Sequence, residues 1–321
     1  MGAARNAIIH LNNMRFMIWA QVSAIGVLAL ILAEAAPAVA HEDITDTLLT
    51  DRFANCAAYA DTYSAEATDI QNRRQFSAEL SISTDGDSCT IRSNAVPNHD
   101  FNTTGHFVTP LAEQVQVYSV PANPVAASRP TALSLQYDNA VFLNGVKLDL
   151  MAAGCFGVRD GRIGCTDMSA PYRYDPLASN AGFGADEHNA HTQPDGTYHY
   201  HGNPMALFDQ DSPAAPSPVI GFAADGFPIF GSYIEDNGTI RPARSSYRLR
   251  TGNRPSGPGD PGGPYDGTFV DDWEYVVGYG DLDQCNGMVQ NGVYGYVITE
   301  TYPHVMACYT GTPDPSFRKR R

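Results

Sequence analysis

The chain has 321 residues, 17% of them charged and 43% hydrophobic, and its 35 acidic and 20 basic residues give a net charge of −15. This length is ample for a hydrophobic core, and the acidic balance excludes nucleic acid as an expected partner because phosphate binding needs clustered Lys and Arg. With 29 Gly, 22 Pro and 17 Tyr, the composition favours turn-rich β structure over a helical bundle.

The first 40 residues predict a secretory signal peptide. Arg15 precedes an apolar run from Phe16 to Ala33, and Ala38-Val39-Ala40 offers a small-residue cleavage site. An uncleaved anchor is the alternative, since a run of about 18 apolar residues is borderline for spanning a bilayer. We expect cleavage, no membrane attachment afterwards, and a mature protein in the periplasm or outside the cell.

All six cysteines follow this segment, as three couples that are local in sequence. An exported protein favours disulfides, and the absence of any Cys-x-x-Cys pair weakens a zinc-ribbon or redox interpretation. The expected disulfides are Cys56–Cys89, Cys155–Cys165 and Cys285–Cys308.

The remaining chain is read mainly as short strands between long loops. Thr50 to Thr68 is the best helical stretch, because Phe53 and several alanines form a weak apolar stripe. Asp85-Gly86-Asp87 and Asn144-Gly145 predict hairpin turns. Alternating residues predict strands at 76–83, 89–92, 113–120, 133–150 (two strands around a turn), 274–278 and 295–299.

These elements predict a mainly β fold: an antiparallel β-sandwich-like domain with long loops, one or two short helices and three disulfides. We divide the chain into the signal peptide at 1–40, a β-rich N-terminal part at 41–125 that can be integral to the main domain, and the main domain at 126–321.

Four histidines lie within residues 188–201, around a predicted turn. Gln193 to Thr197 reads as a three-residue hairpin loop with a glycine bulge, because Pro presets the first loop position and Gly takes the left-handed third. This loop pairs His191 with His199, so that both share one strand face with His201. A two-residue turn would instead pair His191 with Tyr200 and separate the cluster.

Three converging imidazoles are a ligand set suited to zinc or copper. His188, at the entrance of the hairpin, and His99, in a distant loop, are further candidate ligands. Asp225 and Glu187 are the candidate catalytic groups, acting as general base or as orienting partners of the ligands. A metal-dependent hydrolase or oxidoreductase would use an open position on the metal, although the residues name no reaction.

Two other interpretations stand beside this one. Asp281 and Asp283 bring carboxylates together at short spacing, so calcium is possible there. A non-catalytic extracellular binding module, whose tyrosine-rich hairpin packs against a glycan or protein partner, is the alternative to a metal site; a small-molecule ligand is equally open.

The motif Tyr198-His199-Tyr200-His201, preceded by His191, resembles the YHYH family of secreted or periplasmic bacterial proteins. Blocks in the same order extend the resemblance over about residues 90–312, and they lie at 97–99, 144–146, 220–231, 281–287 and 302–308. It implies an exported β-rich protein and supplies no activity. Residues 292–297 lack the histidine of the second Tyr-His-Tyr pattern that the family can carry, so no second hairpin site is implied.

Overall fold

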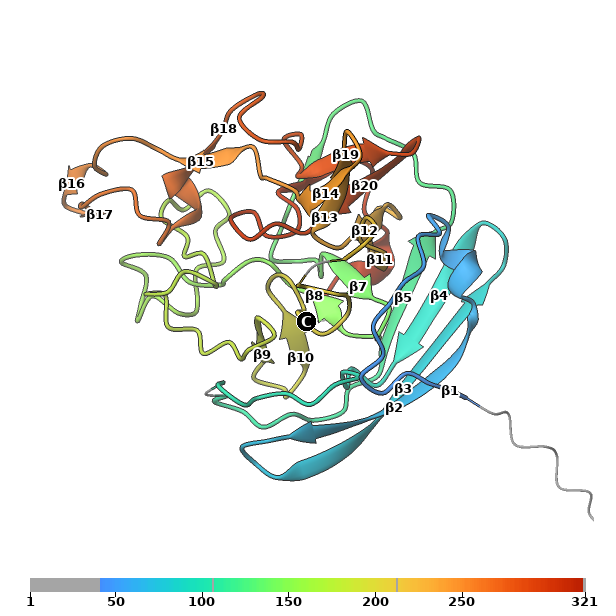
Figure 1. The fold of residues 1–321 in the computed structure, drawn as a ribbon. Helices are drawn as coiled ribbons and strands as arrows, with labels where there is room; N and C mark the ends of the chain where they lie inside the picture. The colour runs from blue at the N-terminus through green and yellow to red at the C-terminus, as the bar shows by residue number, and fades with distance from the viewer. Residues whose placement is uncertain (1–40, 106, 212, 320–321) are drawn as a thin grey trace, which may run out of the picture. The chain divides into compact units, whose positions relative to one another are not determined.

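Short strands and 3-10 helices form the regular structure of residues 41–105, 107–211 and 213–319, which the computed structural model describes (Figure 1). Residues 41–321 group as one unit. The predicted signal peptide at 1–40 lies outside the described residues, and the boundary near residue 125 stays a prediction. No helix in the described ranges has the length and apolar character needed to cross a membrane.

The strands of the described residues are mostly two to five residues long. In chain order they are β1 (Glu42–Asp43), β2 (Asp61–Asp69), β3 (Arg74–Thr84), β4 (Ser88–Ser93), β5 (Gln116–Pro121), β6 (Thr131–Ala132), β7 (Ala140–Phe142), β8 (Lys147–Leu148), β9 (Ala190–Thr192), β10 (Tyr198–Tyr200), β11 (Val219–Ala223), β12 (Pro228–Phe230), β13 (Tyr233–Asp236), β14 (Thr239–Pro242), β15 (Tyr247–Leu249), β16 (Ser256–Gly257), β17 (Asp260–Pro261), β18 (Trp273–Tyr275), β19 (Gly287–Gln290), β20 (Val293–Val297) and β21 (Cys308–Tyr309). The 3-10 helices are η1 (Cys56–Tyr59), η2 (Val270–Asp272) and η3 (Pro315–Phe317).

The first large sheet has the order β1-β2-β3-β4-β5. Along β3 every second side chain, from Phe76 to Ile82, is buried, as the alternating sequence predicts. The turn at Asp85-Gly86-Asp87 joins β3 to β4 in the predicted hairpin, and Thr84 pairs with Cys89.

The predicted helix over Thr50–Thr68 is wrong. Only η1 forms a helical turn there, and β2 then pairs along its whole length with β3. Ala65 and Ala67 are buried two residues apart, which is the strand period. The β-branched and aromatic residues Thr62 and Tyr63 suit a pleated strand, so pairing with the long neighbour outweighs a weak helical stripe.

The second large sheet has the order β19-β20-β12-β11-β7-β8-β10-β9 and carries the histidine hairpin at one edge (Figure 1). The Asn144-Gly145 turn joins β7 to β8 as predicted. Pairing is mixed: β8 with β10, β12 with β20, and β1 with β2 are parallel, while the other pairings of these two sheets are antiparallel. The fold is mainly β, but the sheets are not purely antiparallel.

One hydrophobic core joins the two sheets. Phe76 and Leu80 of the first sheet belong to the same buried cluster as Phe142 and Tyr200 of the second sheet and its hairpin. The β7–β8 turn approaches β4 closely at Gly145, where an added Cβ would lie 2.6 Å from the Cβ of Ser93. Packing between the sheets therefore sets where β8, and β10 beside it, can lie.

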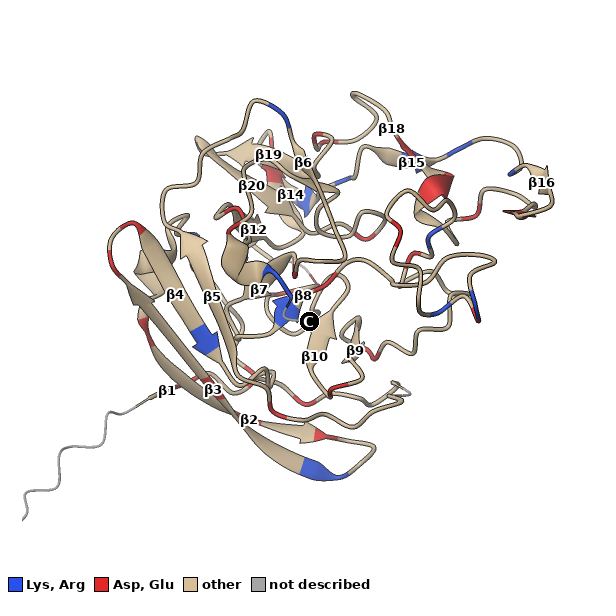
Figure 2. Ribbon diagram, turned by 180° about the vertical axis from the view of Figure 1, so that it is seen from behind, with Lys and Arg blue, Asp and Glu red and all other residues tan. Residues whose placement is uncertain are grey.

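All three predicted disulfides are confirmed: Cys56–Cys89, Cys155–Cys165 and Cys285–Cys308. No cysteine of the described residues is free. Figure 2 shows acidic and basic positions interspersed along strands and loops. Three disulfides fit a protein of an oxidising compartment.

The loop lengths closed by two buried disulfides predict their relative effects on stability. Cys56–Cys89 spans 33 residues and Cys155–Cys165 spans 10. Chain entropy gives about 4 and about 3 kcal/mol respectively, so replacing the first pair by serine should lower the unfolding free energy by about 1 kcal/mol more than replacing the second. Urea denaturation of the two double variants measures this, and a reversed order would contradict it.

Candidate metal centre

The β9–β10 hairpin has the predicted register. Gln193 and Thr197 close the loop, with Gln193 N donating to Thr197 O at 2.9 Å and Gly196 N donating back to Gln193 O at 2.8 Å. Gly196 has φ +86°, the left-handed conformation that its loop position requires. As a result His191 stands directly opposite His199, and the two-residue turn is excluded.

Three imidazole rings meet on one face of this hairpin. The ring centroids of His191, His199 and His201 are 4.7–4.8 Å apart, and the rings are steeply inclined to one another, by 68–84°. One nitrogen from each ring lies within 4.8 Å of the others. His199 and His201 are buried and His191 is half-buried, so the cluster is largely shielded from water.

Burial keeps the triad neutral. It lowers the pKa of His191 and lowers the pKa values of His199 and His201 far more. Mutual repulsion between protonated rings acts in the same direction for the latter two. Neutral imidazole is the form that binds a metal ion.

The ring hydrogen bonds test whether a cation fits here. His191 Nδ1 lies 2.7 Å from Phe183 O, so Nδ1 carries the proton and Nε2 presents its lone pair. That Nε2 is 3.1 Å from the Nε2 of His201. Two nitrogens on a tetrahedral zinc ion, each about 2.0–2.1 Å from the metal, are about 3.3 Å apart. The spacing therefore suits two ligands of one ion.

His201 can supply the second of these two ligands. Its Nδ1 is buried without a hydrogen-bond partner in the described residues. A proton on its Nε2 donates to the lone pair of His191 Nε2. A metal ion bound by the two nitrogens would take the place of this proton, since a ligating imidazole presents its lone pair to the metal.

A charged network beside the triad was missed by the sequence analysis. Lys147 pairs with His199 across the parallel β8–β10 contact, and its Nζ lies 3.1 Å from Asp138 Oδ1. Lys319 pairs with Asp149 in the same network. The available signal was a Lys and an Asp two residues apart within an otherwise apolar strand, which places both charges on one face.

His99 and His188 lie together, apart from the triad. Their ring centroids are 4.0 Å apart. His99 Nε2 lies 2.7 Å from the hydroxyl of Tyr200, which points to the opposite face of the hairpin, and His99 Nδ1 lies 2.7 Å from Asp100 O. Burial and the neighbouring His188 ring lower the pKa of His99 to about 3. Both His99 nitrogens are engaged, so the structure does not bring these two candidates into the ligand set.

Glu187 anchors the loop that contains Thr103 and Thr104. Its carboxylate accepts hydrogen bonds from the backbone N–H groups of Thr103 and Thr104, each at 3.0 Å. Partial burial alone would raise its pKa, but the hydrogen bonds together lower it to about 2. In the described residues none of its hydrogen bonds reaches the triad.

The hydrogen-bond partners of Asp225 also lie outside the triad. Its Oδ2 accepts from the Tyr296 hydroxyl at 2.6 Å and from Gly311 N at 2.8 Å, while Oδ1 is buried without a hydrogen bond. Burial raises its pKa. This carboxyl ties β11 and β20 to the C-terminal segment, and no described contact supports a catalytic role at the histidines.

The carboxylates considered for calcium have protein partners. Asp281 accepts two hydrogen bonds from the Arg241 guanidinium, at 2.8 and 2.9 Å, which hold its pKa at about 2. Asp283 accepts from two backbone N–H groups and from the Tyr294 hydroxyl. These contacts account for both residues without calcium.

Fold and site together define a β-rich protein, linked by three disulfides, with a buried histidine triad that can hold a metal ion. The chain belongs to the YHYH protein family, whose model matches residues 117–311, more than half of the chain. That range holds the whole hairpin; the block predicted at 97–99 lies before it. The chain matches none of the curated proteins and none of the solved structures with which it was compared.

The hairpin loop predicts a specific glycine requirement. Gly196 and Gly238 both have positive φ, +86° and +82°, but a Cβ on Gly196 would lie 2.6 Å from Ala112 Cβ, whereas nothing lies within 4 Å at Gly238. Gly238→Ala should cost about 1 kcal/mol of unfolding free energy, and Gly196→Ala roughly 2–4 kcal/mol because overpacking adds to the strain. Equal losses in chemical denaturation would refute the close approach.

Glu187 predicts a pH dependence of stability. Its folded pKa of about 2 lies below the ordinary 4.5, so its stabilising effect is complete above pH 4.5 and is lost as the pH falls toward 2. Glu187→Gln should therefore be less stable than wild type near pH 6, with the difference shrinking on acidification. Unfolding free energies from pH 6 to 3 measure it, with the exposed Glu235→Gln as control; a difference that is constant with pH would contradict it.

Proposed function

We propose that this is an exported protein that binds zinc or copper through His191, His199 and His201. The observation that carries the proposal is the convergence of one nitrogen from each ring within 4.8 Å on a single, largely buried face of the hairpin. A ligand set of imidazoles alone suits these two metals better than magnesium or calcium, which prefer oxygen.

Three protein ligands leave a further coordination position open. A bound metal would supply a Lewis acid or an activated water there, and copper would supply redox chemistry. The chain's own contribution is to keep the rings neutral, largely shielded from water and oriented, since His191 is fixed by Phe183 O. We therefore propose a metal-dependent hydrolase or oxidoreductase, in which neither Glu187 nor Asp225 contributes a described contact to the metal site.

The proposed compartment is the periplasm or the cell exterior. The three disulfides support an oxidising environment, and the apolar segment with its Ala-x-Ala site at 38–40 supports export. We also propose that the ligand is a small molecule, a glycan or a protein, and not nucleic acid or membrane lipid, given the acidic balance of the chain.

The metal proposal predicts which histidines matter. Protein purified from the periplasm or medium should contain about one Zn or Cu per chain by elemental analysis. The His199→Ala, His201→Ala double variant should lose at least 90% of that metal, because one remaining imidazole cannot hold the ion. The matched variant His188→Ala should retain it, since that ring lies with His99 instead.

Circular dichroism of the variants separates loss of ligands from loss of fold. Metal-free wild-type protein that gains no Zn or Cu on dialysis against either ion would overturn the proposal. A non-catalytic binding module with a structural YHYH hairpin would then be the better account of the same residues.

A further inference from the structure

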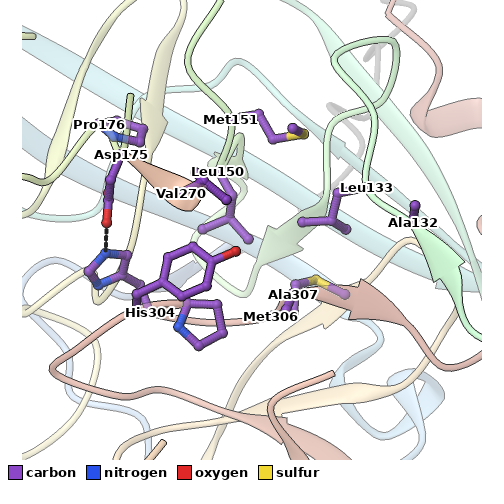
Figure 3. A pocket seen from close by; sticks show the side chains of 12 residues that line it. Ala132, Leu133, Leu150, Met151, Asp175, Pro176, Val270, His304, Met306 and Ala307 are labelled. Carbon is purple, nitrogen blue, oxygen red and sulfur yellow. Dashed lines mark hydrogen bonds and ion pairs between the residues drawn. The ribbon is translucent and has the colours of Figure 1, made fainter. Parts of the chain in front are cut away.

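A cavity of about 200 Å³ is lined by residues that lie outside the histidine triad (Figure 3). Its walls come from distant parts of the chain and are mainly apolar: Leu133, Leu150, Met151, Val270 and Met306. A dry aliphatic cavity of about 150 Å³ can hold benzene. This one therefore has room for a single ring with a small substituent, and its methionines favour an aromatic ring.

The polar side chains that line the cavity are Asp175, Tyr302 and His304. His304 Nε2 lies 3.1 Å from Asp175 Oδ2, and the two side chains are 14% and 5% exposed (Figure 3). The carboxylate can only accept, so Nε2 carries the proton and Nδ1 presents a lone pair. Nδ1 has no hydrogen bond within the described part of the chain. The pair therefore offers an acceptor for a ligand O–H.

The backbone holds His304 in a demanding conformation. Its φ is +64°, a region that residues other than glycine rarely adopt. Asp175 is anchored in turn, because its Oδ1 accepts from Leu177 N at 3.0 Å. The backbone of His304 and the carboxylate of Asp175 are therefore each held in place, which fixes the geometry of the pair.

The cavity adjoins the triad. Gly202 follows His201 directly, and a Cβ on Gly202 would lie 3.4 Å from His304 Cβ, so the missing side chain lets His304 approach the end of the strand. On another wall, Asp149 N donates to Tyr200 O at 2.9 Å, and the parallel register of Tyr200 with Leu148 continues to place Leu150 beside Gly202, the residue after His201.

We propose that this cavity binds a small phenol, with the ring among the aliphatic and methionine side chains and the hydroxyl donating to His304 Nδ1. Binding itself depends only on the cavity. The further inference that phenols are the substrates of the histidine triad also rests on the proposed metal function.

The test is a calorimetric titration of the purified protein, stripped of metal with EDTA, with p-cresol and with toluene, which lacks only the hydroxyl. p-Cresol should bind one to one, about tenfold more tightly than toluene, as expected for one hydrogen bond. His304→Phe should abolish this tenfold preference while toluene still binds. Equal affinities in the wild type would overturn the role of His304.

A second set of variants tests whether the ligand binds in this cavity. Leu133→Trp fills the cavity and should abolish binding of both compounds, whereas Val277→Trp, at a residue 84% exposed, should bind as wild type does. If Leu133→Trp fails to fold, NMR of the wild type decides: p-cresol should shift the methyl signals of Met151 and Met306 and the ring signals of His201. Saturable binding that shifts none of these, or no saturable binding at all, refutes the proposal.

Because these titrations use metal-free protein, their outcome is independent of the metal analysis. Phenol binding without any metal site would leave the cavity proposal standing and remove only the substrate assignment. A metal site without phenol binding would leave the metal proposal standing and refute the cavity proposal.

Discussion

The register of the β9–β10 hairpin is the constraint on which the site depends. A slip of one residue would turn His191 to the opposite face from His199. The loop is held from outside as well as by its own bonds: Gly196 O accepts from Ala112 N at 3.0 Å, and Asp195 O accepts from Gln114 Nε2 at 2.9 Å. The segment that leads into β5 of the first sheet thus fixes the turn that aligns the histidines in the second.

The two faces of the same hairpin have different physical roles. Tyr198 and Tyr200 are fully buried in the shared core, where their large rings contribute much of the apolar contact. Their hydroxyls are satisfied, by Asp186 in one case and by His99 and Asn144 in the other. The tyrosine face therefore anchors the strand while the histidine face presents ligands, and His99 belongs to the anchor rather than to the metal set.

The accuracy of the sequence-based expectations follows the range of the interactions involved. The Gln193–Thr197 loop could be read correctly because its geometry depends on adjacent residues, Pro194 and Gly196 above all. The helix expected over Thr50–Thr68 failed because pairing with β3, which no local pattern reports, decided the conformation. The same limit explains Lys147: its place beside His199 results from a parallel contact between strands 52 residues apart in sequence.

By itself the sequence determined the β class, the three local disulfides, the hairpin register and hence the triad, since each depends on residues close along the chain or on strand periodicity. Only the tertiary structure decided which histidines stay outside the triad and which carboxylates bind other groups. It alone also formed the His304–Asp175 pair, whose members are 129 residues apart, and the cavity they line. Contacts of that range arise from the packing of whole sheets and loops, which no local pattern of residues specifies.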